Sequence, residues 1–131
     1  MEVVGIGTDI VECLRIARMI ERHGEQFLRR VYTEREIRAC NATKRTTENF
    51  AGRWAAKEAV LKAIGGADAG PVSWTEIEIR GGPGGQPQVL LCGATRELAR
   101  RLRVADVYLS VAHCRAYATA YALAVRAPAA T

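Results

Sequence analysis

The chain has 131 residues, of which 49% are hydrophobic and 25% are charged, and its net charge is +5. This length predicts one domain over residues 1–131, since it suffices for one hydrophobic core and is too short for two comfortable ones. The composition excludes a disordered tail and a membrane protein, because no apolar run approaches the length that spans a bilayer. The positive charge favours anionic partners such as nucleotides, nucleic acid or an acidic protein.

The first residues, Met1 to Gly5, are acidic and interrupted by glycine, so they predict no secretory signal, and we expect a cytoplasmic protein. Four cysteines are scattered through the chain without the paired spacing of a zinc site or of a small disulfide framework. We interpret them as free thiols. These are Cys13, Cys40, Cys92 and Cys114.

A short apolar run from Val3 to Ile10 predicts a strand that ends at Asp9. Gly5 and Gly7 interrupt its apolar run, and glycines inside a strand often mark the close approach of another backbone or of a ligand. From this segment alone, Asp9 is best interpreted as a cap of the following helix.

An amphipathic helix is predicted next, from about Glu12 to His23, because apolar residues recur there at i, i+3, i+4 and i+7. Its outward side is cationic and carries one apolar residue. The outward side chains are Arg15, Arg18, Met19 and Arg22. Such a face suits the docking of an acidic amphipathic helix, although a solvated charged face is the commoner explanation.

Two further helical segments follow, a short turn over residues 27–31 and a helix from about Glu34 to Asn41. Thr33 and Glu36 have the spacing of a capping box at the start of the second segment. Lys44 and Arg45 then stand immediately before the next helix, where N–H groups and the helix dipole favour an anion. On local grounds, a solubilising basic turn is the favoured explanation of these two residues.

The longest predicted helix lies between Thr46 and Gly65. Thr46 or Thr47 is expected to cap its start, and Gly65 to supply the left-handed residue after its last turn. Alanines and large apolar residues leave little of its surface polar, so we expect it to be largely buried. One row of side chains at i, i+4 and i+8 consists of Trp54, Glu58 and Lys62. A carboxylate on a mostly buried helix requires a chemical reason.

After a loop from Gly65 to Ser73, the sequence predicts a hairpin with strands from Trp74 to Arg80 and from Gln88 to Cys92. The glycine-rich turn over residues 81–87 joins two strands and lacks the Gly-Lys-Ser/Thr ending of a phosphate loop, so we reject that interpretation. A helix is predicted from Ala94 to Arg103.

Two final strands are predicted over residues 107–112 and 117–126, before a frayed tail over residues 127–131. One face of the last strand is entirely alanine, which lets another element approach closely. The alanine-rich central helix is the obvious candidate. Since strands and helices do not alternate regularly, we expect an α+β fold with a mainly antiparallel sheet packed on the central buried helix.

Taken separately, Asp9, Glu58, Lys62 and His113 are each more readily structural than catalytic. Together, however, four motifs resemble in sequence and spacing the holo-acyl-carrier-protein synthases, the short-chain group of the 4'-phosphopantetheinyl transferases. The motifs are Gly5–Glu12, Arg53–Ala59 with Lys62, Gly85-Gln86-Pro87 and Ser110–His113. The similarity covers nearly the whole chain.

The resemblance implies an enzyme that moves 4'-phosphopantetheine from coenzyme A, its co-substrate, to a serine of an apo acyl carrier protein and releases adenosine 3',5'-bisphosphate. It also implies Mg²⁺ bound by Asp9 and Glu58, with Lys62 neutralising the diphosphate or leaving group. Glu58 is the implied base, acting through a metal-associated water, and whether Asp9 shares that task stays open.

Other roles follow from the same resemblance. Residues implied to contact the nucleotide phosphates are Lys44, Arg45, Arg53 and His113, and those implied to line the coenzyme cleft are Gly65 and Pro87. The implied docking face for the acidic carrier consists of Arg15, Met19 and Arg22. Members this short generally work as trimers with the site between subunits, so a homotrimer is expected.

Two positions depart from the family pattern. Leu61 stands where many relatives have a small hydroxyl residue, and Ala112 precedes His113 where Ser or Thr is common. Either change would remove a hydrogen bond to a phosphate. A catalytically reduced carrier-binding homologue is therefore one alternative function.

A small basic nucleic-acid-binding module is the other alternative. The arginine-rich faces fit it, but only 6% of residues are aromatic and no RNA-recognition signature is present. That function would also leave Asp9 and Glu58 unexplained, because they would repel phosphate without a metal. We therefore expect no nucleic-acid partner, and the sequence leaves open whether the carrier serves fatty-acid or polyketide synthesis.

Overall fold

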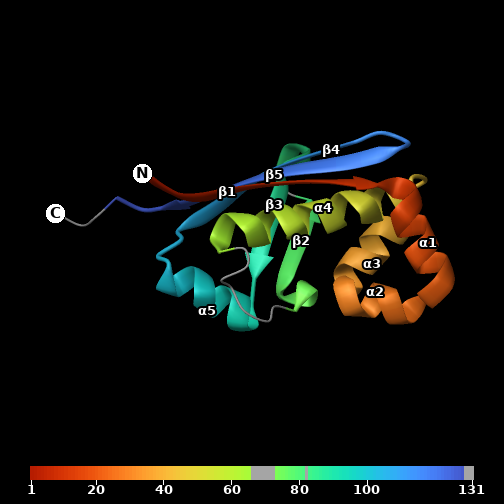
Figure 1. Ribbon diagram of the computed structural model, residues 1–131, viewed down its shortest axis with the longest axis horizontal. Helices are drawn as coiled ribbons and strands as arrows, with labels where there is room; N and C mark the ends of the chain where they lie inside the picture. The colour runs from red at the N-terminus through yellow and green to blue at the C-terminus, as the bar shows by residue number, and fades with distance from the viewer. Residues whose placement is uncertain (66–72, 82, 129–131) are drawn as a thin grey trace.

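The computed structural model describes residues 1–65, 73–81 and 83–128. A three-stranded sheet lies along one side of a long central helix (Figure 1), and its strand order is β1-β5-β4. The middle strand, β5, is antiparallel to both neighbours. The sheet and its helix are formed by β1 (Glu2–Glu12), β4 (Asp106–His113), β5 (Tyr117–Arg126) and α4 (Thr46–Ile64). These layers confirm the expected α+β class.

Three helices gather at one end of α4, and a hairpin runs past α4 from the sheet toward a further helix on the other side (Figure 1). The three helices are α1 (Cys13–His23), α2 (Glu25–Val31) and α3 (Glu34–Asn41). The predicted capping box of α3 is confirmed, because Thr33 Oγ1 accepts from the Glu36 N–H at 3.2 Å and Glu36 Oε1 accepts from the Thr33 N–H at 2.9 Å.

The hairpin forms a separate two-stranded sheet. Its elements are η2 (Trp74–Glu76), β2 (Ile77–Gly81), η3 (Pro83–Gly85) and β3 (Pro87–Leu91), followed by α5 (Gly93–Arg101). The prediction that a strand begins at Trp74 is therefore wrong. The Glu76 carboxylate accepts from the Ala94 N–H at 2.9 Å and from Thr95 Oγ1 at 3.1 Å, and this capping of α5 accompanies a helical turn instead of a strand.

The first strand is longer than predicted, because β5 pairs with it as far as Glu12, which lies opposite Tyr117. Asp9 therefore lies within the strand, opposite Ala120, and the interpretation of Asp9 as a helix cap is wrong. The helix α1 instead begins where the Cys13 N–H donates to the Ala116 carbonyl at 2.9 Å.

The start of α4 also differs from the prediction. Its cap position is Arg45, without a side-chain cap hydrogen bond, and Thr46 Oγ1 donates to the Thr43 carbonyl at 3.0 Å. At the other end, Gly65 follows the helix with a positive φ of 155°, as predicted.

Glycines and alanines let α4 lie directly against the sheet. A Cβ on Gly7 would lie 2.0 Å from the Ala59 carbonyl oxygen, and one on Gly5 would lie 2.1 Å from that of Ala63. The alanine face of β5 is buried against the same helix. It consists of Ala118, Ala120, Ala122 and Ala124. The close packing predicted from both patterns is confirmed.

Within the described residues, no helix is both long enough and apolar enough to cross a bilayer. The cytoplasmic location stays a prediction. Most of the loop predicted between Gly65 and Ser73, together with Gly82 and the last three residues of the tail, lies outside the described residues.

Candidate active site

Three side chains that are far apart in the sequence meet where β1 crosses α4. Asp9 is on the strand face that also carries Gly5 and Gly7, which contact α4. Lys62, on the helix, donates to Asp9 Oδ1 at 3.3 Å and to the Thr8 carbonyl at 3.0 Å. Glu58, one turn earlier on the same helix, completes the cluster.

The two carboxylates of this cluster, Glu58 and Asp9, repel each other, so a positive charge between them would be stabilising. Burial raises the pKa of Glu58, and the nearby Asp9 carboxylate raises it further, whereas Lys62 and Arg15 act in the opposite direction. The Asp9 side chain is only 17% exposed, and that of Lys62 is 50% exposed. Two repelling carboxylates at a partly open site therefore have only Lys62 and Arg15 as counter-charges among the residues that affect Glu58.

The donor set suits a magnesium ion better than a fully protein-bound metal. No group of three or more His, Cys, Asp or Glu side chains that could hold a metal occurs among the described residues. Magnesium commonly uses one or two carboxylates and completes its shell with water and substrate phosphate oxygens. Asp9 and Glu58 provide such a pair.

Apart from this charged cluster, a pocket with a volume of ≈200 Å³ lies between α4, the hairpin and β4. Arg53, Pro87 and His113 line it together with Asn49 and Gly52, among others. The Arg53 Nε is buried and has no hydrogen-bond acceptor among the residues described. A buried donor without an acceptor favours an anionic group at this position.

The other three predicted coenzyme residues lie outside this pocket. Lys44 and Arg45 are exposed just before α4, and the Asn49 amide, which reaches the pocket, donates to the Arg45 carbonyl at 2.9 Å. Gly65 is at the opposite end of α4. The chain therefore brings Arg53, Pro87 and His113 together, places the two basic residues beside them, and keeps Gly65 apart.

The two halves of the candidate site lie on opposite edges of the three-stranded sheet. Asp9 is on β1, His113 is on β4, and β5 separates the two strands. One face of this sheet is covered by α4. A ligand that contacts both halves within one chain would have to pass this helix.

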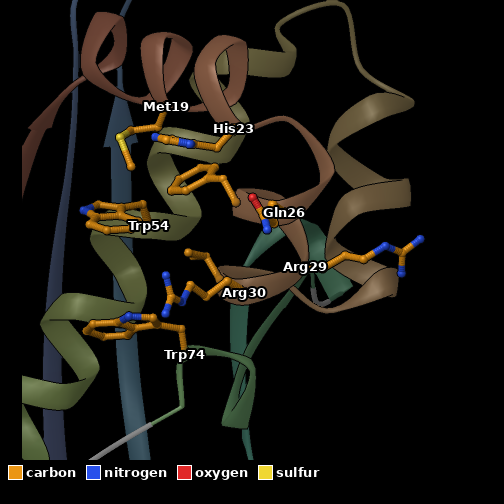
Figure 2. Close-up of a pocket in the computed structure, with 9 residues that line it drawn as sticks. Met19, His23, Gln26, Arg29, Arg30, Trp54 and Trp74 are labelled. Atoms are coloured by element: carbon orange, nitrogen blue, oxygen red, sulfur yellow. The ribbon is translucent and has the colours of Figure 1, made fainter.

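The outward face of α1 borders a large groove of ≈740 Å³. Met19 and His23 line it from α1, and the indole rings of Trp54 and Trp74 form an aromatic wall (Figure 2). Phe27 also lines the groove. The Trp54 ring centroid is 6.1 Å from that of Phe27 and 6.0 Å from that of Trp74.

Figure 2 also shows the cationic rim of this groove, where Arg30 points toward the two indole rings and Arg29 points away from them. Arg15 and Arg22, the other two predicted docking residues, are exposed on α1. The face predicted from helical periodicity is thus continuous, through Met19, with an apolar groove that periodicity did not reveal.

Sequence reasoning also missed a buried ion pair. Lys57, which is 1% exposed, donates to Glu36 Oε1 at 2.8 Å, and Glu36 is itself 1% exposed. Burial lowers the pKa of Lys57, and the Glu36 carboxylate opposes this change. The only sequence signal was a lysine on a helix that was otherwise expected to be buried.

Comparison with known proteins gives a consistent result. A sequence model described as the 4'-phosphopantetheinyl transferase superfamily matches residues 5–125. The holo-[acyl-carrier-protein] synthase of Rhodopirellula baltica is 46% identical over 121 residues, which are 92% of this chain and 96% of the relative.

Solved structures agree with this relationship. The holo-[acyl-carrier-protein] synthase of Neisseria meningitidis has a TM-score of 0.86 at 31% identity, over 95% of this chain and 99% of that one. The enzyme of Bacillus anthracis, solved in complex with CoA (3',5'-ADP), has a TM-score of 0.76 at 32% identity, over 97% of this chain and all of the other.

Proposed function

The chain belongs to the 4'-phosphopantetheinyl transferase superfamily, and we propose that it is a holo-[acyl-carrier-protein] synthase that transfers 4'-phosphopantetheine from coenzyme A to a serine of an apo acyl carrier protein. The meeting of Asp9, Glu58 and Lys62 carries this proposal, because phosphoryl-type transfer depends on gripping the diphosphate and neutralising its charge. The family membership also supports this proposal over the nucleic-acid-binding alternative.

Asp9 and Glu58 would hold the Mg²⁺, which supplies a Lewis acid for the diphosphate oxygens when bound. Lys62 reaches the same place and provides a second positive charge for the diphosphate or for the leaving adenosine 3',5'-bisphosphate. Glu58 is the candidate base toward the carrier serine, since its pKa is raised by burial and by Asp9 and it can accept a proton through a water.

The pocket around Arg53 suits the nucleotide of coenzyme A. Arg53 and His113 offer nitrogen donors to phosphate oxygens, and Pro87 offers an apolar wall. Lys44 and Arg45 extend the positive charge from the pocket rim into solvent, where they would steer a polyanionic ligand. Gly65 belongs to this proposal only if the coenzyme also reaches the other end of α4.

An assembly of several copies would complete the site. Asp9 and His113 lie on opposite edges of the sheet, so the two halves can serve one coenzyme when neighbouring subunits meet edge to edge. The sheet face away from α4 is apolar and exposed, with Ile6 at 69%, Ile10 at 64% and Tyr121 at 58%. We therefore propose a homotrimer with sites between subunits.

The carrier is proposed to dock along α1. Arg15 and Arg22 would attract an acidic surface, while Met19 and the neighbouring aromatic groove would receive an apolar side chain. The charge of +5 over the whole chain would speed this encounter and make it sensitive to salt.

The test is to incubate the purified chain with apo carrier protein, coenzyme A and Mg²⁺ and to weigh the carrier by mass spectrometry. We expect the carrier to gain the mass of one phosphopantetheine. If several carriers bind but none gains mass while a known synthase modifies them all, the catalytically reduced homologue replaces this proposal. Restoring activity by Leu61→Ser or Ala112→Thr would then identify the residue responsible.

A further inference from the structure

The ammonium group of Lys57 lies in the interior with all of its hydrogen-bonding capacity used. It donates to Glu36 Oε1 at 2.8 Å, to the Trp74 carbonyl at 3.0 Å and to the Ile77 carbonyl. An ammonium group has three N–H donors, so the three acceptors satisfy it completely. The two carbonyls belong to Trp74, the first residue of the short turn η2, and to Ile77, the first residue of β2.

The carboxylate of Glu36 extends this network to two more backbone groups. Its Oε1 accepts from the Thr33 N–H, and its Oε2 accepts from the Ile79 N–H, each at 2.9 Å. The ion pair therefore ties the start of α3 and the corner between η2 and β2 to the middle of α4. Four backbone groups depend on these two buried side chains.

The corner held in this way carries one wall of the aromatic groove. Trp74 is the residue whose carbonyl Lys57 binds, and its ring lies 6.0 Å from that of Trp54. Trp54 precedes Lys57 by three residues on α4, so α4 holds the Trp54 indole directly and the Trp74 residue through the ammonium group. Figure 2 shows the two indoles on the same side of the groove.

Stability alone does not account for this arrangement. Replacing a buried ion pair with apolar residues of similar volume is often neutral or stabilising, whereas removing one partner is strongly destabilising. An apolar pair could not make the directional hydrogen bonds to the Trp74 and Ile77 carbonyls. These bonds therefore fix the position of the corner between η2 and β2.

We propose that Lys57 is a positioning residue for carrier recognition: with Glu36 it holds Trp74 beside Trp54 and so keeps open the groove beside Met19. This proposal rests on the proposed function, since the groove matters only if a carrier docks there. Lys57 itself touches neither substrate.

The test uses the double variant Lys57→Met/Glu36→Leu, which removes both charges together, with Glu36→Gln, which keeps the shape of the Glu36 side chain but removes its charge, as a second variant. The chain has two tryptophans, and both line the groove, so near-UV circular dichroism and tryptophan fluorescence report on it directly. Far-UV circular dichroism and a cooperative melt establish that each variant folds.

We expect both variants to change the tryptophan signals and to raise KM for the carrier, by about tenfold in the double variant, which corresponds to about 1.4 kcal/mol. We expect kcat and KM for coenzyme A to change by no more than about twofold. A tenfold change in either would require a loss of about 1.4 kcal/mol of binding or transition-state free energy, and Lys57 contacts neither substrate. Unchanged tryptophan signals, an unchanged carrier KM, or an equal rise of both KM values would each overturn the proposal. If the double variant does not fold, Glu36→Gln decides by the same criteria.

Failure of the proposed function would look different. In that case the wild-type chain itself would leave every carrier unmodified, and the kinetic comparison could not be made. Binding of fluorescently labelled apo carrier to the wild type and to Glu36→Gln then replaces KM as the readout. An equal affinity for the two proteins would overturn the positioning role.

Discussion

Lys62 Nζ donates to Asp9 Oδ1 at 3.3 Å, joining two residues that are 53 positions apart in the sequence. The bond exists because β1 lies against α4 at Gly5 and Gly7, which brings the next residue on that strand face over the helix row of Glu58 and Lys62. Because Gly5 and Gly7 have no side chains, the strand can approach the helix closely, and this approach places Asp9 in the charged cluster.

This relationship predicts that Mg²⁺ stabilises the folded chain. A ligand that binds only the native state at a hundred times its dissociation constant adds about 2.7 kcal/mol. We expect Mg²⁺ to raise the melting temperature of the wild type, and Asp9→Asn or Glu58→Gln each to abolish the increase. The measurement is thermal melting with and without Mg²⁺, without any substrate.

Glu12→Gln is the matched control for this experiment, because Glu12 is an exposed acid on the same strand. Its melting temperature should respond to Mg²⁺ like that of the wild type. A full increase in Asp9→Asn would remove Asp9 from the metal site, and the same result in Glu58→Gln would remove Glu58.

Much of the fold could be predicted because periodic patterns determine it locally. The capping box at Thr33, the glycine at the end of α4 and the alanine face of β5 each depend on a few neighbouring residues, and all three are confirmed. The errors arose at residues whose conformation depends on partners that are distant in the sequence. β1 continues past Asp9 because β5 pairs with it, and η2 replaces the start of a strand where Glu76 caps α5.

The site shows the same division. The row of Glu58 and Lys62 was visible from helical spacing, whereas its proximity to Asp9 became an expectation only through the family resemblance. The pair of Lys57 and Glu36 could not be predicted, because it is formed by residues 21 positions apart on two helices. Lys57 lies on a helix expected to be buried and Glu36 lies in a capping box, but neither pattern indicates that the two side chains meet.

Gly7→Ala should strongly destabilise the chain. The added Cβ would lie 2.0 Å from the Ala59 carbonyl oxygen, which is backbone and cannot move without shifting α4. We expect a loss of about 3 kcal/mol or more, in the range seen for severe overpacking and strain. Urea denaturation measures it, and Gly81→Ala is the control because nothing lies within 4 Å of its Cβ position. A loss no larger than that of Gly81→Ala would contradict the close packing.

The cysteines should divide into two classes by reactivity. Cys92 and Cys114 are exposed, whereas Cys13 and Cys40 are buried, and burial raises the pKa of the Cys40 thiol to about 11. A thiol reagent at mildly alkaline pH should therefore modify two residues in the native chain and four in guanidinium. Cys92→Ser and Cys114→Ser should each remove one reactive thiol. Rapid modification of Cys40 in the native state would show that its surroundings open readily.

Glu76 should contribute stability that is lost in acid. Burial alone would raise its pKa, but hydrogen bonds from the Ala94 N–H and from Thr95 lower the pKa below its ordinary value. Because the folded pKa is the lower one, the contribution is present above the unfolded pKa and disappears as pH falls through the folded pKa. Glu76→Gln should therefore cost about 1 kcal/mol at neutral pH and progressively less in acid.

Urea denaturation of wild type and Glu76→Gln at a series of pH values measures this difference. Glu97→Gln is the control, since Glu97 is an exposed acid on α5 whose contact is an ion pair with Arg100. A difference between wild type and Glu76→Gln that stays constant down to acid pH would show that the charge of Glu76 is not involved.

The outer face of the three-stranded sheet should control assembly. Neighbouring strands place Ile6, Leu123 and Tyr108 side by side, and the next row contains Tyr121. Charging the centre of this face with Tyr121→Glu should convert a trimer into monomers of 14.3 kDa, since a central aromatic anchor typically contributes about 2 kcal/mol or more to an interface. Light scattering after size-exclusion chromatography measures the mass. The control is Leu90→Glu, because Leu90 is 47% exposed but lies on the other sheet.

Activity should fall with the trimer, because Asp9 and His113 lie on opposite edges of the sheet and need neighbouring subunits to meet. A folded monomeric variant with full activity would place the whole site within one chain.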